Sequence, residues 1–194
     1  METPNNSKYV EIYTEKNPNP NSLKFVSDQV LLPEGTVEYT DAESAWNCPL
    51  AKDLFKFNFV TGVFITANFV TVTKTDLVGW EDIAGMISSL IKGYLEEGKP
   101  LFIEAIKANT ISADDPEIIQ KIKELLDEYI RPAVEQDGGA IHFKSFDDAS
   151  GVVTVQLQGS CSGCPSSTIT LKAGIENLMK RMIPEVQEVV AENV

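Results

Sequence analysis

The sequence predicts an α+β protein made of two small domains. Short runs of β-branched and aromatic residues predict strands, and segments whose apolar residues recur every three or four positions predict helices. The strands and helices of the first half follow no repeated strand–helix–strand order, which argues against a parallel α/β sheet. The chain has 194 residues, a length that fits two compact domains. We expect the first domain over residues 1–100, a linker over 101–114 and the second domain over 115–194.

Turn-forming residues divide the first domain into its expected elements. The cluster Asn17–Asn21 and the segment Pro33-Glu34-Gly35 predict turns, Ala67-Asn68 predicts a hairpin turn, and Gly98 and Pro100 end a long helix. The region contains no histidine, no glycine-rich phosphate loop and no Gly-x-Ser-x-Gly motif, so it predicts no catalytic constellation. The expected elements are strands 8–14, 22–26 and 37–39, helices 41–47 and 49–57, strands 60–66 and 69–73, and a helix over 80–97.

The second domain is predicted to follow the order α-β-β-α-β. Asp115-Pro116 places an N-cap before a proline at the first helical position, and Arg131-Pro132 is expected to close that helix. Pro184 ends the second helix. After the first helix, the expected elements are strands 140–146 and 152–157, a helix over 166–182 and a strand over 186–190.

Two of the three cysteines, Cys161 and Cys164, stand at C-x-x-C spacing in a loop of small residues between a strand and a helix. Pro165 is expected to open the helix, because proline is favoured at the first helical position. The positive end of the helix dipole then favours thiolate over thiol at both cysteines. Thiolates bind metals and attack disulfides, so the loop predicts either a metal site or a redox site.

One C-x-x-C pair supplies only half of a metal site, since zinc and iron–sulfur clusters usually take four protein ligands. Cys48 lies far upstream, and His142 is the only histidine. Neither completes the site in an obvious way. Two chains related by a two-fold axis bring four thiolates together, so the ligand count predicts a dimer.

Composition excludes several kinds of partner. A net charge of −13 argues against nucleic acid, whose binding relies on Lys and Arg. No apolar run reaches the roughly 18 residues of a membrane span, so we expect no membrane association.

Residues 1–8 lack the apolar core of a signal peptide and the Arg-rich pattern of a transit peptide, which predicts a cytoplasmic protein. The odd cysteine count does not suggest a disulfide framework.

Both halves of the chain contain combinations of short motifs typical of one family. In the second domain these are Ile130-Arg131-Pro132, Asp137-Gly138-Gly139, Leu157–Cys161, Cys164–Ser167, Thr170-Leu171-Lys172 and Ile183–Val186. In the first domain they are Asn17–Phe25, Pro49-Leu50-Ala51, Leu54-Phe55, Val63-Phe64 and Phe69–Lys74. By these residues, the second domain resembles the C-terminal domain of NifU, the unit that defines Nfu-type iron–sulfur scaffold and carrier proteins. The first domain looks like the Nfu N-terminal domain, and the order of the two is that of Nfu proteins rather than of full NifU.

The resemblance implies that Cys161 and Cys164 bind a [4Fe–4S] cluster shared between two chains. It implies delivery of that cluster to apo iron–sulfur proteins, supply by upstream assembly machinery, and no enzymatic turnover. A cluster held by exposed loops at a dimer seam leaves readily when the cysteines of a client compete for it. We therefore expect both cysteines in exposed loop positions.

Two alternatives use the same cysteines. A structural zinc site shared between chains takes the same four thiolates. A dithiol oxidoreductase is the enzyme alternative, although Pro165 opens the helix after the second cysteine rather than after the first. Among the other candidates, Cys48 is expected to be a small, partly buried residue and His142 a surface residue rather than a ligand. Asp137-Gly138-Gly139 is expected to form a glycine-dependent turn that also supports the cysteine loop.

Overall fold

The computed structural model describes residues 9–104, 115–161 and 165–193. These residues form two compact units, one around a five-stranded sheet and one around a three-stranded sheet. The mixture of helices and sheets confirms the α+β class. Residues 105–114, which make up most of the predicted linker, lie outside the described residues.

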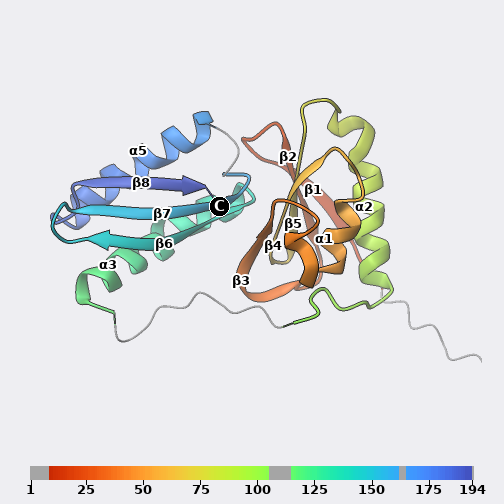
Figure 1. The fold of residues 1–194 in the computed structure, drawn as a ribbon, viewed down its shortest axis with the longest axis horizontal. Helices are drawn as coiled ribbons and strands as arrows, with labels where there is room; N and C mark the ends of the chain where they lie inside the picture. The colour runs from red at the N-terminus through yellow and green to blue at the C-terminus, as the bar shows by residue number, and fades with distance from the viewer. Residues whose placement is uncertain (1–8, 105–114, 162–164, 194) are drawn as a thin grey trace, which may run out of the picture. The chain divides into compact units, whose positions relative to one another are not determined.

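The first unit is a five-stranded sheet with its helices on one face (Figure 1). Strands β2, β5, β4 and β3 pair antiparallel in that order, and β1 stands beside β2. Apolar side chains from β2, β4 and β5 pack against those of α1 and α2. The strands are β1 (Ile12–Lys16), β2 (Ser22–Ser27), β3 (Leu32–Tyr39), β4 (Val60–Ala67) and β5 (Phe69–Lys74). The helices are η1 (Ser44–Asn47), α1 (Pro49–Leu54) and α2 (Trp80–Glu96).

Two predictions for β3 and its surroundings are wrong. Pro33-Glu34-Gly35 lies inside β3 rather than in a turn, because a register shift between Leu32 and Thr36 absorbs the irregular residues as a bulge. Gly35 takes a φ of 82°, which glycine adopts without strain. The expected helix 41–47 shrinks to a single 3₁₀ turn. The Ser44 N–H donates to Asp41 Oδ1 (2.7 Å), and Ser44 Oγ donates to the Asp41 carbonyl (2.8 Å), a local arrangement that competes with helix formation.

The boundaries of other first-unit elements move by a few residues. The expected strand 8–14 is Ile12–Lys16, and its first residue, Lys8, lies outside the described residues. The helix expected over 49–57 ends at Leu54. The hairpin about Ala67-Asn68 is confirmed, with Thr66 paired to Phe69 and Ala67 at a φ of 39°.

The second unit has the predicted order α-β-β-α-β. Antiparallel strands β6 and β7 form a hairpin, and the last strand, β8, returns parallel to β7. Figure 1 shows α5 running along one side of this sheet. The core joins side chains from β6, β7 and β8 to those of α3 and α5. The elements are α3 (Glu117–Leu125), η2 (Leu126–Ile130), α4 (Arg131–Gln136), β6 (Gly139–Asp147), β7 (Val152–Gly159), α5 (Pro165–Met182) and β8 (Glu188–Asn193).

The largest differences from the prediction in this unit are at the end of the first helix and in the last strand. Arg131-Pro132 does not close the first helix, which continues through the π turn η2 into α4. Pro132 has no N–H to donate to the carbonyl four residues earlier, and the wide turn avoids that conflict by pairing the Arg131 N–H with the Leu126 carbonyl. The last strand is Glu188–Asn193 rather than 186–190.

Candidate metal centre

Cys161 lies directly beyond the end of β7, where the chain leaves the three-stranded sheet. β7 ends at Gly159, whose φ of 68° turns the backbone. α5 begins at Pro165, which confirms the predicted helix start. Cys164 lies outside the described residues, so Cys161 is the member of the predicted pair whose surroundings the structure gives.

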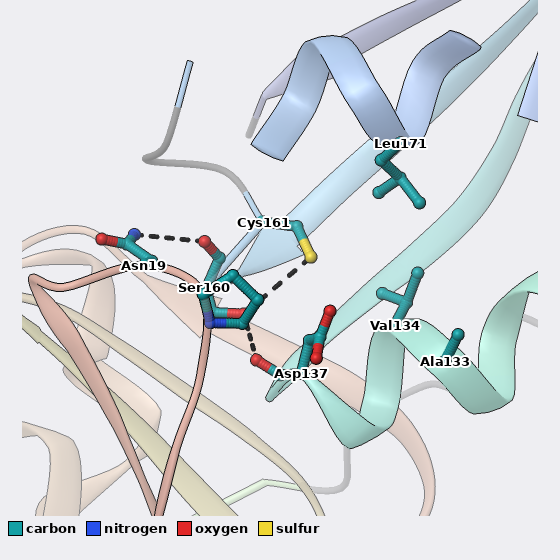
Figure 2. Close-up of a pocket in the computed structure, with 8 residues that line it drawn as sticks. Asn19, Ala133, Val134, Asp137, Ser160, Cys161 and Leu171 are labelled. Atoms are coloured by element: carbon teal, nitrogen blue, oxygen red, sulfur yellow. Dashed lines mark hydrogen bonds between the residues drawn. The ribbon is translucent and has the colours of Figure 1, made fainter. Parts of the chain in front are cut away.

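The Cys161 side chain is buried, with 6 % of its surface exposed. It belongs to the apolar core of the second unit together with Val134, and Leu171 packs against the same core. Figure 2 shows its sulfur pointing to the side where Val134 of α4 and Leu171 of α5 lie. The expectation of an exposed cysteine is therefore wrong for Cys161. Its side chain packs into the apolar core of the second unit instead of lying along the surface.

Gly139, the first residue of β6, leaves the space that the Cys161 sulfur fills. It pairs with Gly159 across the β6–β7 ladder. A Cβ atom placed on Gly139 would lie 2.9 Å from Cys161 Sγ and 2.6 Å from the backbone oxygen of Gln158. Both distances are shorter than a carbon atom tolerates. Any side chain at position 139 would therefore push against the sulfur and against the neighbouring strand.

Ser160 ties the cysteine loop to the turn before β6. Its N–H donates to the Gly138 carbonyl (3.3 Å), and its Oγ donates to the Asp137 carbonyl (Figure 2). The same Oγ lies 3.9 Å from Cys161 Sγ. Gly138 has a φ of 77°, which favours glycine. These contacts confirm that Asp137-Gly138-Gly139 both forms a turn and supports the cysteine loop.

His142 is half-buried rather than fully on the surface, so that prediction is only partly right. Its Nε2 lies 3.1 Å from the Gln158 side-chain oxygen. Burial lowers the pKa of the imidazole, although the hydrogen bond to Gln158 opposes that shift.

Among the described residues, no group of three or more His, Cys, Asp or Glu side chains lies close enough together to hold a metal ion.

Cys48 is fully buried in the core of the first unit, which goes beyond the partial burial predicted. It precedes Pro49 at the start of α1, and the hydroxyl group of Tyr39 interacts with its thiol. Burial raises the pKa of the thiol. A neutral thiol in an apolar core is a poor metal ligand.

Sequence reasoning gave no role to Ser160. It is 2 % exposed, yet the sequence alone does not distinguish it from the other small residues of the loop. Its position could have indicated a role, because it lies directly between the end of the strand and the first cysteine. A small hydroxyl side chain there can form a hydrogen bond with a neighbouring turn.

Comparisons with known proteins cover both units. Residues 12–98 match the family described as scaffold protein Nfu/NifU N terminal, and residues 122–190 match the NifU-like domain. NifU-like protein 4, mitochondrial, of Arabidopsis thaliana is 42 % identical over 182 residues, which are 92 % of this chain and 64 % of that protein. The NFU1 iron-sulfur cluster scaffold homolog, mitochondrial, of Homo sapiens is 41 % identical over 184 residues, 94 % of this chain and 72 % of that protein.

The chain spans just under two thirds of the length of two Arabidopsis relatives, NifU-like proteins 4 and 5. A solution NMR structure of a NifU-like protein from Saccharomyces cerevisiae shares 23 % identity and a TM-score of 0.45, covering 54 % of this chain and 92 % of that one. That TM-score is too low to support an argument.

The predicted cytoplasmic location is wrong by this comparison, because these relatives are named as mitochondrial proteins. The prediction relied on a pattern missing from residues 1–8, which lie outside the described residues. Among the described helices, none is both long enough and apolar enough to cross a membrane. Two matched domains in the expected order, and 41 % identity to a protein of which the chain covers 72 %, place this chain in the Nfu family of NifU-like iron–sulfur cluster scaffold proteins.

Proposed function

We propose that the chain carries a [4Fe–4S] cluster as cargo, bound by Cys161 and Cys164 of two copies, and delivers it to apo iron–sulfur proteins. The observation that carries the proposal is the placement of Cys161 between β7 and α5, braced by the turn at Asp137–Gly139. Cysteine thiolates are the usual ligands of such clusters. The family membership supports the same role.

The second copy follows from the ligand count. Cys161 and Cys164 are two thiolates, and four are needed. The part of the chain that the structure describes offers no group of three or more candidate ligands. Cys48 is buried in the core of the other unit with a raised pKa. A second C-x-x-C loop is therefore the simplest source of the missing thiolates.

Delivery needs ligand exchange and no net oxidation or reduction. A thiolate of the acceptor protein forms an iron–sulfur bond as the bond to Cys161 or Cys164 breaks, and the released cysteine takes up the proton that the acceptor lost. The cluster keeps its iron, sulfide and charge. A protein acting in this way is a carrier rather than an enzyme, and its partners are apo-proteins that receive clusters and the machinery that supplies them.

The burial of Cys161 adds a requirement. Its sulfur points toward Val134 and Leu171, so cluster binding requires the side chain to turn away from them. Without a cluster, the apolar surroundings shield the thiol. We therefore expect Cys161 to react slowly with iodoacetamide in the iron-free protein, and at the rate of an unfolded cysteine in denaturant.

Anaerobic reconstitution with iron and sulfide tests the proposal. The expected result is an absorption band at about 400 nm, about two irons and two sulfides per chain, and a dimer mass by light scattering. Zinc at about half an equivalent per chain, with no chromophore, would favour a structural metal site. Absence of any metal, with a readily reduced Cys161–Cys164 disulfide, would favour a dithiol oxidoreductase.

A further inference from the structure

Helix α5 presents an uncharged face immediately after the cysteine loop. From residue 169 to residue 178, the exposed positions recur at a spacing of three and four, so they lie on one side of the helix. None of them carries a charge, and Ile169 is 70 % exposed. We call these residues the α5 face: Ile169, Thr170, Ala173, Gly174 and Asn177.

The charged residues of this part of α5 lie off the α5 face and already have partners. Lys172 pairs with Glu188 of β8 at 3.7 Å. Glu176 accepts a hydrogen bond from the Val189 N–H (3.1 Å) and pairs with Lys180. The α5 face is therefore a neutral strip on a chain whose net charge is −13. A second acidic chain meets less repulsion there than over a surface rich in carboxylates.

Gly174 leaves room for a close contact at the α5 face. A Cβ atom placed on Gly174 meets nothing within 4 Å, so packing inside the chain does not require glycine there. Glycine within a helix costs about 0.5–1 kcal/mol relative to alanine. The missing side chain allows another backbone to come close.

We propose that the α5 face packs against the same face of a second copy of this chain. The inference rests on the proposed function, because the shared cluster brings two cysteine loops together and Ile169 lies only one turn beyond the start of α5. Chains joined through Cys161 and Cys164 therefore bring the first turns of their α5 helices near each other, since α5 starts at the residue after Cys164. In a two-fold dimer the same patch serves both copies, and pairing would remove the exposed side chain of Ile169 from water.

Two substitutions test the inference, with one control. Ile169→Glu puts a negative charge at the end of the α5 face nearest the cysteine loop. Ala173→Arg puts a positive charge one turn farther along the face, so that its effect does not depend on adding to the net negative charge of the chain. The control is Met182→Glu, a 54 % exposed apolar residue of the same helix, roughly 140° away around the helix axis. After reconstitution, we expect each test variant to form at least tenfold less cluster-bound dimer than the unmodified chain, and Met182→Glu to match it.

The readouts separate this inference from the proposed function. Circular dichroism of the iron-free variants checks that α5 still folds, and mass and cluster content are then measured together. If the unmodified chain holds no cluster, or holds it as a monomer, the proposed function fails and the interface fails with it. If the unmodified chain forms a cluster-bridged dimer and Ala173→Arg forms as much, the function stands and the α5 face is not the interface.

Discussion

Cys48 and Cys161 are both buried, but the molecule holds them in different ways. Cys48 sits among the apolar side chains of the first core, and the hydroxyl group of Tyr39 contacts its thiol. Cys161 belongs to the second core, where it also lies against the turn before β6. Gly139 leaves room for its sulfur, and Ser160 bonds the neighbouring turn.

Under the proposed function, the difference separates a thiol that fills a core from a thiol that binds a cluster. Many side chains surround Cys48, and burial raises its pKa, so it stays protonated and enclosed. Cys161 lies next to a turn in which Gly139 leaves room for its sulfur. To bind a cluster as proposed, this sulfur must turn away from Val134 and Leu171, whereas Cys48 stays enclosed in its core.

The largest expected contrast is in cluster binding. Under the proposed function, Cys161→Ala removes one of the two thiolates of each chain, and cluster content should fall at least tenfold after reconstitution. Cys48→Ala should keep the full iron content, because a protonated core thiol contributes no ligand. Iron and sulfide analysis of the two variants side by side measures this. A full cluster on Cys161→Ala, or loss of iron from Cys48→Ala, would reverse the two roles.

The next prediction concerns the space that Gly139 leaves for the Cys161 sulfur. Gly139→Ala places a carbon 2.6 Å from the Gln158 carbonyl oxygen and 2.9 Å from the Cys161 sulfur. We expect the free energy of unfolding to fall by about 1–3 kcal/mol, as for other overpacked sites, and cluster content to fall with it. Urea denaturation of the iron-free protein measures the first effect. Gly85→Ala in α2 is the matched control, since a Cβ atom there meets open space and the substitution should raise stability by about 0.5–1 kcal/mol without changing cluster content.

The pH dependence of stability should reveal the contribution of the buried, protonated Cys48 thiol. Burial raises the pKa of its thiol, so the folded protein keeps a proton that the unfolded chain loses above about pH 8.5. The contribution of this thiol is complete below that pH and declines as pH rises, by at most about 1.4 kcal/mol per pH unit. Cys48→Ala should flatten the curve between about pH 8.5 and pH 9.5.

Two buried tyrosines affect the pH dependence of stability only at higher pH. Burial also raises the pKa of Tyr39, and it raises that of Tyr94 to about 12. Their contribution to stability begins to decline above about pH 10. The range from about pH 8.5 to pH 9.5 therefore reports on the Cys48 thiol without these tyrosines. Denaturation curves of the unmodified and Cys48→Ala proteins that stay parallel from pH 7 to 9.5 would contradict the assignment.

The smallest expected effect belongs to Ser160. Ser160→Ala removes the hydrogen bond from Oγ to the Asp137 carbonyl and should cost about 1 kcal/mol, since the site is buried. It should also speed the alkylation of Cys161. Ser150→Ala is the control. It removes an exposed bond to Asp147 (2.6 Å) and should change stability by less than about 0.5 kcal/mol. Equal effects of the two substitutions would show that Ser160 does not brace the loop.

Local patterns predicted much of the fold. Pro165 marks the start of α5, and the Ala67-Asn68 turn joins β4 and β5, because both signals act within a few residues. The failures arise where a longer-range pairing overrides a local signal. Pro33–Gly35 becomes a bulge because β3 pairs with β4 on both sides of it, and the helix passes Pro132 through a π turn.

The sequence predicted which residues form the candidate site, but it did not predict what surrounds them. The spacing of the cysteines identified Cys161, and the segment Asp137–Gly139 was expected to support it. The burial of the sulfur was not predicted, because it depends on where Val134 and Leu171 lie once α4 and α5 have packed. Those contacts join parts of the chain that are distant in sequence, and no local pattern encodes them.

The parallel pairing of β8 with β7 has a consequence for the order of folding. The β6–β7 hairpin joins neighbouring segments, whereas β8 pairs with β7 only after the whole of α5 has intervened. Contacts that close longer loops form later. During synthesis, therefore, the cysteine loop emerges before the strand that completes its sheet. The second core, which contains both Cys161 and Val189 of β8, is complete only once β8 has paired with β7.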